Sequence, residues 1–299
     1  MTYDPRKWTS HLLNIEGSMV REILGRVSLC VIWSAVILIL YDFAPHFFHR
    51  IAIAETAHSL IGASLGLLLV FRTNSSYDRF WEGRKQWGGI VNETRNLARQ
   101  AEAWLAAQPA LARKCICWTI EFPFATMYRL RGVPNNRSVV NDLPTNEVSA
   151  IRQCRNVPLA VARKLTGLIS EAHRDGLIDT QQLRAFDQNI QLLVDYVGAC
   201  ERIRSTPAPY AYVVHLRRAL IVYCLTLPLA LVERFGWEVI VVTLLISYIL
   251  FGIEEIGVEI ENPFGTTVND LQLEVICNTI NGDLLSILDG MEYSLPGRN

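Results

Sequence analysis

The chain has 299 residues, of which 51% are hydrophobic and only 19% are charged, whereas typical soluble domains are about 25% charged. Its mean hydropathy of +0.21 is high for a soluble protein. The formal net charge of −1 excludes the strongly basic surface that nucleic-acid-binding proteins use.

Four apolar runs without charged residues stand out along the chain, at 27–41, 56–71, 219–232 and 239–253. Each run is shorter than the ~20 residues of a membrane-spanning helix, so any one alone could be a buried helix of a soluble protein. Short connections at 42–55 and 233–238 pair the runs into two helical hairpins. Charged residues at the run ends can reach the lipid headgroups and so extend the spans. The sequence therefore predicts four transmembrane helices.

Basic residues indicate the orientation of these helices. The two hairpin connections carry only Arg50 and Arg234. The other basic residues near the run ends lie in the amino-terminal segment and the central region: Arg6, Lys7, Arg21, Arg26, Arg72, Arg79, Arg84, Lys85, Arg202, Arg204, Arg217 and Arg218. The positive-inside rule then predicts that both termini and the central region are cytoplasmic.

The central region is polar and has helical periodicity, with apolar residues such as Trp87, Ile90, Val91 and Leu97 at spacings of three and four. Few runs alternate as strands do, so we expect an all-α protein. We predict four segments: 1–72 with the first two transmembrane helices, 73–216 as a cytosolic helical region, 217–256 with the last two transmembrane helices, and 257–299 as a cytosolic carboxyl-terminal segment.

The sequence contains no motif of a known enzyme class, and its six histidines are scattered. The acidic cluster Glu254, Glu255, Glu259 and Glu261 follows the fourth run, and Glu255 and Glu259 can share a helix face. It lacks the Glu-x-x-His motif of carboxylate metal sites in helical bundles. We expect salt bridges between these acids and the basic central region, with a cation-attracting surface and a metal-dependent membrane enzyme as alternatives. We predict no enzymatic activity, no cofactor and no metal site.

The second apolar run carries two adjacent patterns. Gly62 and Gly66 form a small-xxx-small pair, which allows close approach of a neighbouring helix. Ala63, Leu67 and Phe71 follow at i, i+4 and i+8 on the next stripe of the same helix. Periodicity leaves open whether that stripe lines a pore or is an ordinary core or lipid-facing surface.

Three segments resemble bacterial bestrophin homologues, in the order that this family has them: FRTNSSYDRFWEGRKQWGGIVNETRNL at 71–97, GACERIRSTPAPYAY at 198–212 and IENPFGTTVNDLQLEVICNTI at 260–280. The resemblance implies a homopentameric ion channel of the bacterial inner membrane, with four transmembrane helices, a cytosolic helical bundle and one central pore. It places the hydrophobic neck of the pore on Ala63, Leu67 and Phe71. Ala63 is smaller than the residue usual at its position, which shifts the expected constriction to Leu67 and Phe71.

The resemblance also implies two cytosolic features. A second restriction falls within 178–184, with Gln181 as its residue. The loop 262–270 corresponds to the calcium loop of animal bestrophins, with Asn262 and Asp270 at ligand positions. Thr267 stands where a carboxylate is expected, and calcium prefers six to eight oxygen ligands that include carboxylates, so we expect weak or absent calcium control.

The neck carries no charge and does not set the sign of the permeant ion. Bacterial bestrophins resemble monovalent cation channels, and we therefore expect the protein to conduct cations such as sodium. An anion channel with the same fold, passing chloride, and a non-conducting membrane scaffold are the alternatives. We expect the protein to bind other copies of itself, membrane lipids and monovalent ions. We expect no binding of nucleic acid.

Overall fold

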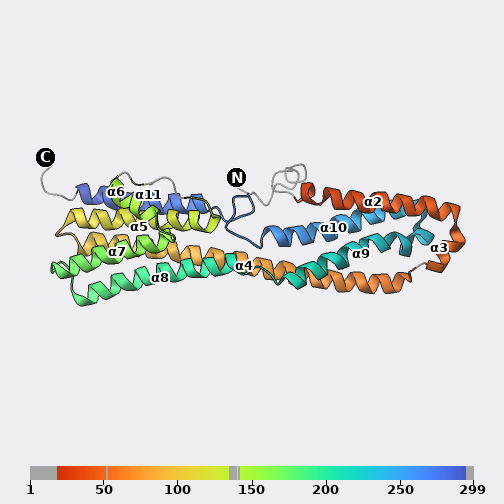
Figure 1. Ribbon diagram of the computed structural model, residues 1–299, viewed down its shortest axis with the longest axis horizontal. Coiled ribbons are helices and arrows are strands. Elements are labelled where there is room, and N and C mark those ends of the chain that lie inside the picture. Colours follow the sequence, from red (N-terminus) through yellow and green to blue (C-terminus); the bar gives the residue numbers. More distant parts are fainter. Residues whose placement is uncertain (1–18, 52, 135–139, 141, 294–299) are drawn as a thin grey trace. The chain divides into compact units, whose positions relative to one another are not determined.

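A computed structural model describes residues 19–51, 53–134, 140 and 142–293. Over these residues the chain forms helices and no strand, which confirms the all-α expectation. Figure 1 shows the elements: α2 (Val20–Phe43), α3 (Pro45–Ile51), α4 (Glu55–Trp104), α5 (Pro109–Arg131), α6 (Thr145–Arg152), α7 (Val157–Arg174), α8 (Thr180–Ser205), α9 (Tyr210–Phe235), the short 3-10 helix η1 (Gly236–Glu238), α10 (Val239–Glu259) and α11 (Leu273–Tyr293).

The chain divides into two compact units. The first, here called the membrane unit, comprises residues 1–80, 207–262 and 267–269, and the second, here called the polar unit, comprises 81–206, 263–266 and 270–299. The boundary between Phe80 and Trp81 falls within α4, which is one uninterrupted helix of 50 residues. The predicted boundary at residue 72 also lies within this helix, and where the membrane ends along α4 stays a prediction.

The membrane unit contains all four apolar runs, each within a single helix: α2, α4, α9 and α10. By length and composition three stretches of the described chain can cross a membrane, and the third of them, Tyr210–Glu259, consists of α9, η1 and α10. Gly236, with φ of 53°, lies between α9 and α10 in the left-handed region that favours glycine, and α9 packs against α10. The predicted short turn of the second hairpin is therefore present.

Apolar residues cover α2 on every side. Ile23, Val27, Cys30 and Ile37 are buried against the neighbouring helices. On the other faces Leu24, Leu29, Ile32 and Ile39 are exposed. Soluble proteins rarely expose contiguous apolar surface of this kind, whereas lipid is its natural solvent. The protein is a membrane protein.

A short helix that the sequence did not predict, α3, lies in the first hairpin connection. It begins at Pro45, whose fixed φ and missing N–H suit the first turn of a helix. Phe48 is buried and packs edge-on against Tyr41, with 6.0 Å between the ring centroids. The connection is thus an ordered helical turn held by aromatic contacts.

The polar unit is a bundle of the carboxyl-terminal part of α4 with α5, α7, α8 and α11. Nearly every residue of α5 from Leu111 to Leu130 is buried. This helix begins at Pro109 and ends at Gly132, whose φ of 70° provides the left-handed carboxyl-terminal cap. Asp179 and Gln182 form a capping box that fixes the start of α8.

Candidate functional site

The stripe Ala63, Leu67 and Phe71 lies on the exposed side of α4. Leu67 and Phe71 are 56% and 58% exposed, whereas Leu65 and Leu69 are only 4% and 1% exposed. Residues two apart on a helix are separated by about 200°, so Leu67 points away from both buried leucines. Within its own chain, this stripe is therefore left free to face lipid, a central axis or another subunit.

The two glycines of α4 have different surroundings. A Cβ added at Gly62 would lie 2.4 Å from the hydroxyl oxygen of Tyr223 on α9, whereas one added at Gly66 would meet nothing within 4 Å. Gly62 therefore allows close packing of α4 on α9 inside the chain. Gly66 makes no such contact within the chain, and a role in packing between subunits stays a prediction.

A buried histidine, which the sequence did not single out, contacts the same tyrosine. His58 of α4 is buried and stacks on Tyr223, with 4.2 Å between the ring centroids. Its Nε2 lies 3.2 Å from the hydroxyl oxygen of Thr226. The only sequence signal for this contact was a histidine at the start of an apolar run, and together with Gly62 it joins α4 to α9.

A buried ion pair follows the stripe directly. Arg72 is 2% exposed, and its Nη2 donates to Glu261 Oε2 at 2.6 Å while Nη1 donates to Ser76 at 3.0 Å. The other oxygen of Glu261 accepts from the backbone N–H of Ala208 at 2.6 Å, and Arg79 donates to the Glu261 carbonyl oxygen at 3.1 Å. Burial alone would raise the pKa of Glu261, but the hydrogen bonds from Ala208 and Arg72 lower this pKa below its usual range. Glu261, which follows α10, is thus held as a charged carboxylate that contacts Arg72 of α4 and Ala208, two residues before α9.

Two further acids of the predicted cluster are paired on α10. Glu254, whose side chain is 2% exposed, lies 2.8 Å from Arg217 and 3.4 Å from Arg26. Glu255 lies 2.6 Å from the same Arg26. Glu254, Glu255 and Glu261 form salt bridges as expected. Arg72 and Arg217 border the central region 73–216, whereas Arg26 of α2 lies in the amino-terminal segment, which the expectation did not include.

Three other acids of the membrane unit have varied surroundings. Glu55 accepts two hydrogen bonds from Arg234, at 2.7 and 2.8 Å. Asp42 and Asp78 are exposed. The amino-terminal bases Arg6 and Lys7 lie outside the described residues.

Gln181 lies in the first turn of α8 and is exposed, whereas Ile178, just before the helix, is buried. Within the predicted range 178–184, Gln181 is therefore free to face another subunit or solvent and Ile178 is not. The role of Gln181 in a restriction stays a prediction.

The loop 262–270 is folded on itself. The N–H of Leu271 donates to the Pro263 carbonyl oxygen at 2.9 Å. A Cβ added at Gly265 would lie 2.4 Å from a carboxylate oxygen of Asp270, so only glycine allows this approach. In the part of the chain that the structure describes, no group of three or more His, Cys, Asp or Glu side chains could hold a metal ion.

These features define the chain as a helical membrane protein, in which one apolar stripe of α4 is left exposed by its own chain and is followed by a buried ionic network. The family model described as "Bacterial/Fungal Bestrophin protein" matches residues 1–286, so the chain belongs to this family. The predicted resemblance is confirmed.

Known relatives support this assignment along the whole chain. Voltage-dependent anion channel-forming proteins of Nostoc and Synechocystis are each 38% identical to it, covering 95% of this chain and 92% of theirs. The protein of the same description from Escherichia coli K12 is 27% identical, covering 98% of this chain and 96% of its own. The crystal structure of a bacterial bestrophin homologue from Klebsiella pneumoniae is 29% identical and superposes with a TM-score of 0.84, covering 89% of this chain and 98% of that one.

These names correct one expectation. We expected a cation channel because the sequence motifs look bacterial. That expectation is wrong, because the relatives from Nostoc, Synechocystis and Escherichia coli are all described as anion channel-forming. The physical reason for the error is that the neck stripe carries no charge, so the motifs around it held no information on the sign of the ion.

Proposed function

We propose that this chain assembles as a homopentamer in the bacterial inner membrane, with both termini in the cytoplasm, and conducts small anions such as chloride. The pore neck is formed by Ala63, Leu67 and Phe71 from each copy of α4. The description of its relatives as anion channel-forming proteins supports the anion class.

The exposed apolar stripe of α4 carries this proposal. Its three residues face away from the core of their own chain and none is charged. In a ring of identical helices such a stripe lines the central axis and makes a hydrophobic constriction, which can gate by dewetting. Ala63 is the smallest of the three, so Leu67 and Phe71 form the narrowest part of the neck.

The ion pairs of the membrane unit remove one argument for sodium. Glu55, Glu254, Glu255 and Glu261 each pair with an arginine, so these four acids offer no uncompensated negative charge to a cation. Chloride also holds its water less tightly than sodium, so an apolar constriction penalises its partial dehydration less.

The reversal potential of purified protein in planar bilayers under a sodium chloride gradient tests the proposal. We expect it close to the chloride equilibrium potential. A reversal potential close to that of sodium would refute anion selectivity.

Variants of the neck test the pore assignment separately. Phe71→Ala and Leu67→Ala widen the proposed constriction and are expected to raise the single-channel conductance while the oligomer keeps its size. Ile61→Ala is the matched control, because Ile61 is an exposed apolar residue of the same helix that lies about 120° around the helix axis from Leu67. Equal conductance in all three variants would contradict the neck assignment, and silence of both neck variants with intact oligomers would favour a scaffold.

A further inference from the structure

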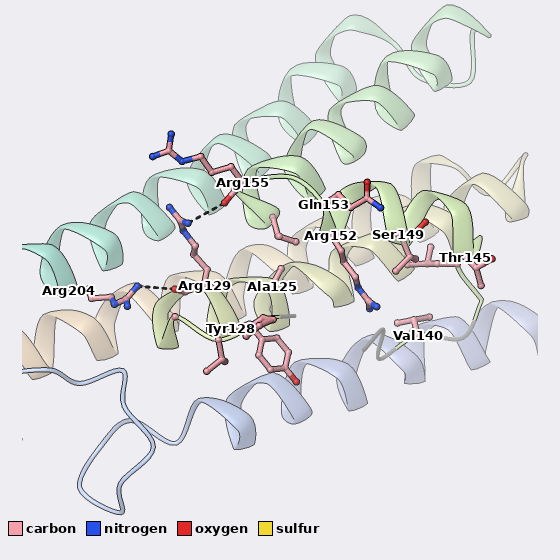
Figure 2. Close-up of a pocket in the computed structure, with 16 residues that line it drawn as sticks. Ala125, Tyr128, Arg129, Val140, Thr145, Ser149, Arg152, Gln153, Arg155 and Arg204 are labelled. Carbon is pink, nitrogen blue, oxygen red and sulfur yellow. Dashed lines mark hydrogen bonds between the residues drawn. The ribbon is translucent and has the colours of Figure 1, made fainter. Parts of the chain in front are cut away.

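A cavity of about 780 Å³ lies in the polar unit (Figure 2). It is lined by the end of α5, by α6, by the start of α7 and by Arg204 near the end of α8. Sites for small organic molecules typically enclose about 300–1,000 Å³. The cavity is therefore large enough for a small molecule, and no part of the proposed ion pathway uses it.

The charge of the cavity wall has one sign. Four of its lining residues are arginines, Arg129, Arg152, Arg155 and Arg204, and no aspartate or glutamate is among the described lining residues. A concave surface lined by one sign of charge concentrates ligands of the opposite sign. The cavity thus favours an anion.

Three of the four arginines are already engaged or turned away. Arg129 donates to Glu201 at 2.9 Å and to the Arg155 carbonyl oxygen at 3.2 Å, and Arg204 donates to the Arg129 carbonyl oxygen at 3.1 Å. Figure 2 shows the guanidinium group of Arg155 pointing away from Arg152. Of the four, Arg152 alone has a buried guanidinium nitrogen without a hydrogen-bond partner among the described residues.

Arg152 extends from α6 into the cavity, as Figure 2 shows. Its Nη2 is buried and has no hydrogen-bond partner among the residues that the structure describes. A buried donor of a charged group without an acceptor is costly, and a carboxylate or phosphate oxygen is the acceptor that best fits a guanidinium group. Ser149 and Thr145 of the same helix also line the cavity and carry hydroxyl groups.

The rest of the wall is mainly apolar and includes Val133, Pro134, Leu143, Val148 and Val157. An inorganic anion would leave this surface uncovered, whereas an organic anion would bury it. We propose that the cavity binds a small organic oxyanion, a carboxylate or a phosphate monoester on an apolar body, with Arg152 as the residue that binds the anionic group.

Isothermal titration calorimetry on the detergent-solubilised full-length protein tests this site. The probes are benzoate and phenyl phosphate, which share a ring and differ in the anionic group, with neutral benzamide and inorganic phosphate as controls. We expect saturable binding of at least one ring-bearing anion, and weaker binding of both controls. The stronger of the two anions then identifies the headgroup as carboxylate or phosphate.

Substitutions of residues that line the cavity locate the binding. Arg152→Gln removes the charge and is expected to weaken binding about 10-fold or more, as the loss of a charge-assisted hydrogen bond predicts. The matched control Arg155→Gln removes an arginine that lines the same cavity with its guanidinium turned away, and is expected to weaken binding far less than Arg152→Gln does. If Arg152→Gln does not fold, Ser149→Trp at an exposed position of α6 blocks the cavity instead and abolishes binding.

Four results would overturn the proposal. The first is that neither ring-bearing anion binds. The second is that benzamide binds as tightly as benzoate, and the third is that inorganic phosphate binds as tightly as phenyl phosphate. The fourth is equal affinity in the wild type and in the folded Arg152→Gln or Ser149→Trp variant. None of these readouts depends on conductance, so the outcome is independent of the proposed channel function.

Discussion

The substitution Glu261→Gln isolates the charge of one buried carboxylate. Glu261 pairs with Arg72, whose side chain is 2% exposed, at 2.6 Å. Glutamine keeps an oxygen that accepts a hydrogen bond but loses the negative charge. The variant therefore leaves the Arg72 guanidinium buried and without a counter-charge.

The expected cost follows from that burial. Removing one partner of a buried ion pair destabilises a protein by about 3–5 kcal/mol. We expect the lower end, about 3 kcal/mol, because Arg72 keeps its hydrogen bond to Ser76 and glutamine can still accept from Arg72 or from the N–H of Ala208. The double variant Arg72→Gln/Glu261→Gln removes both charges and should lose less than the sum of the two single variants.

The measurement is the free energy of unfolding in detergent micelles, followed by tryptophan fluorescence. The matched control is Glu259→Gln, two residues earlier. The Glu259 carboxylate accepts a contact of 3.5 Å from Asn269, and its loss should cost less than about 1 kcal/mol. Equal unfolding free energies for Glu261→Gln and Glu259→Gln would refute the reasoning. So would strict additivity in the double variant.

Three other predictions concern acid, packing and thiols. Since the folded-state pKa of Glu261 is lowered, its ion pair stabilises the protein above about pH 4.3, and this stability is lost as the pH falls further. The unfolding free energy of the wild type should therefore drop more steeply than that of Glu261→Gln between about pH 5 and pH 3. Parallel curves of unfolding free energy against pH would contradict this. Gly62→Leu should lower the free energy of unfolding by about 1–3 kcal/mol through overpacking against Tyr223. Gly66→Leu should leave the free energy of unfolding unchanged but reduce the oligomer size measured by light scattering. An oligomer of normal size would count against packing between subunits at Gly66. A maleimide at about pH 8 should label the exposed Cys154 in the native protein. It should not label Cys115, because burial raises the pKa of this thiol to about 12. Labelling of Cys115 in the native protein, detected by mass spectrometry, would contradict this prediction.

The helices could be predicted because their signals are local. The apolar runs, the proline at 109, the glycines at 132 and 236 and the polar connections act over a few residues, and each coincides with an observed helix or helix end. The seven-residue helix α3 was missed because its stabilising contact, Phe48 on Tyr41, belongs to packing and not to periodicity.

The ionic network could not be predicted in detail, since its partners are far apart in the chain. Arg72 and Glu261 are 189 residues apart, and Arg26 and Glu255 are 229 apart. Charge spacing along one helix says nothing about such pairs. The acids were recognised as a cluster, but the arginines that neutralise them become identifiable only once α2, α4, α9 and α10 are packed.

The stripe of α4 lies between these two cases. Spacing places Ala63, Leu67 and Phe71 on one face, but which face turns outward depends on how Gly62 and His58 meet Tyr223. Arg152 was missed altogether, because an arginine at the end of a short helix has no distinctive pattern until the cavity around it has formed.

The outward direction of the α4 stripe has a consequence for how this protein can evolve. Ala63, Leu67 and Phe71 touch little of their own chain, so replacing one with a larger or smaller apolar residue leaves the packed interior as it was. Folding therefore sets little constraint on the width of the proposed neck. Their buried neighbours Leu65, Leu69 and Arg72 have no such freedom. Among members of the family, variable positions and invariant positions should therefore alternate along this helix.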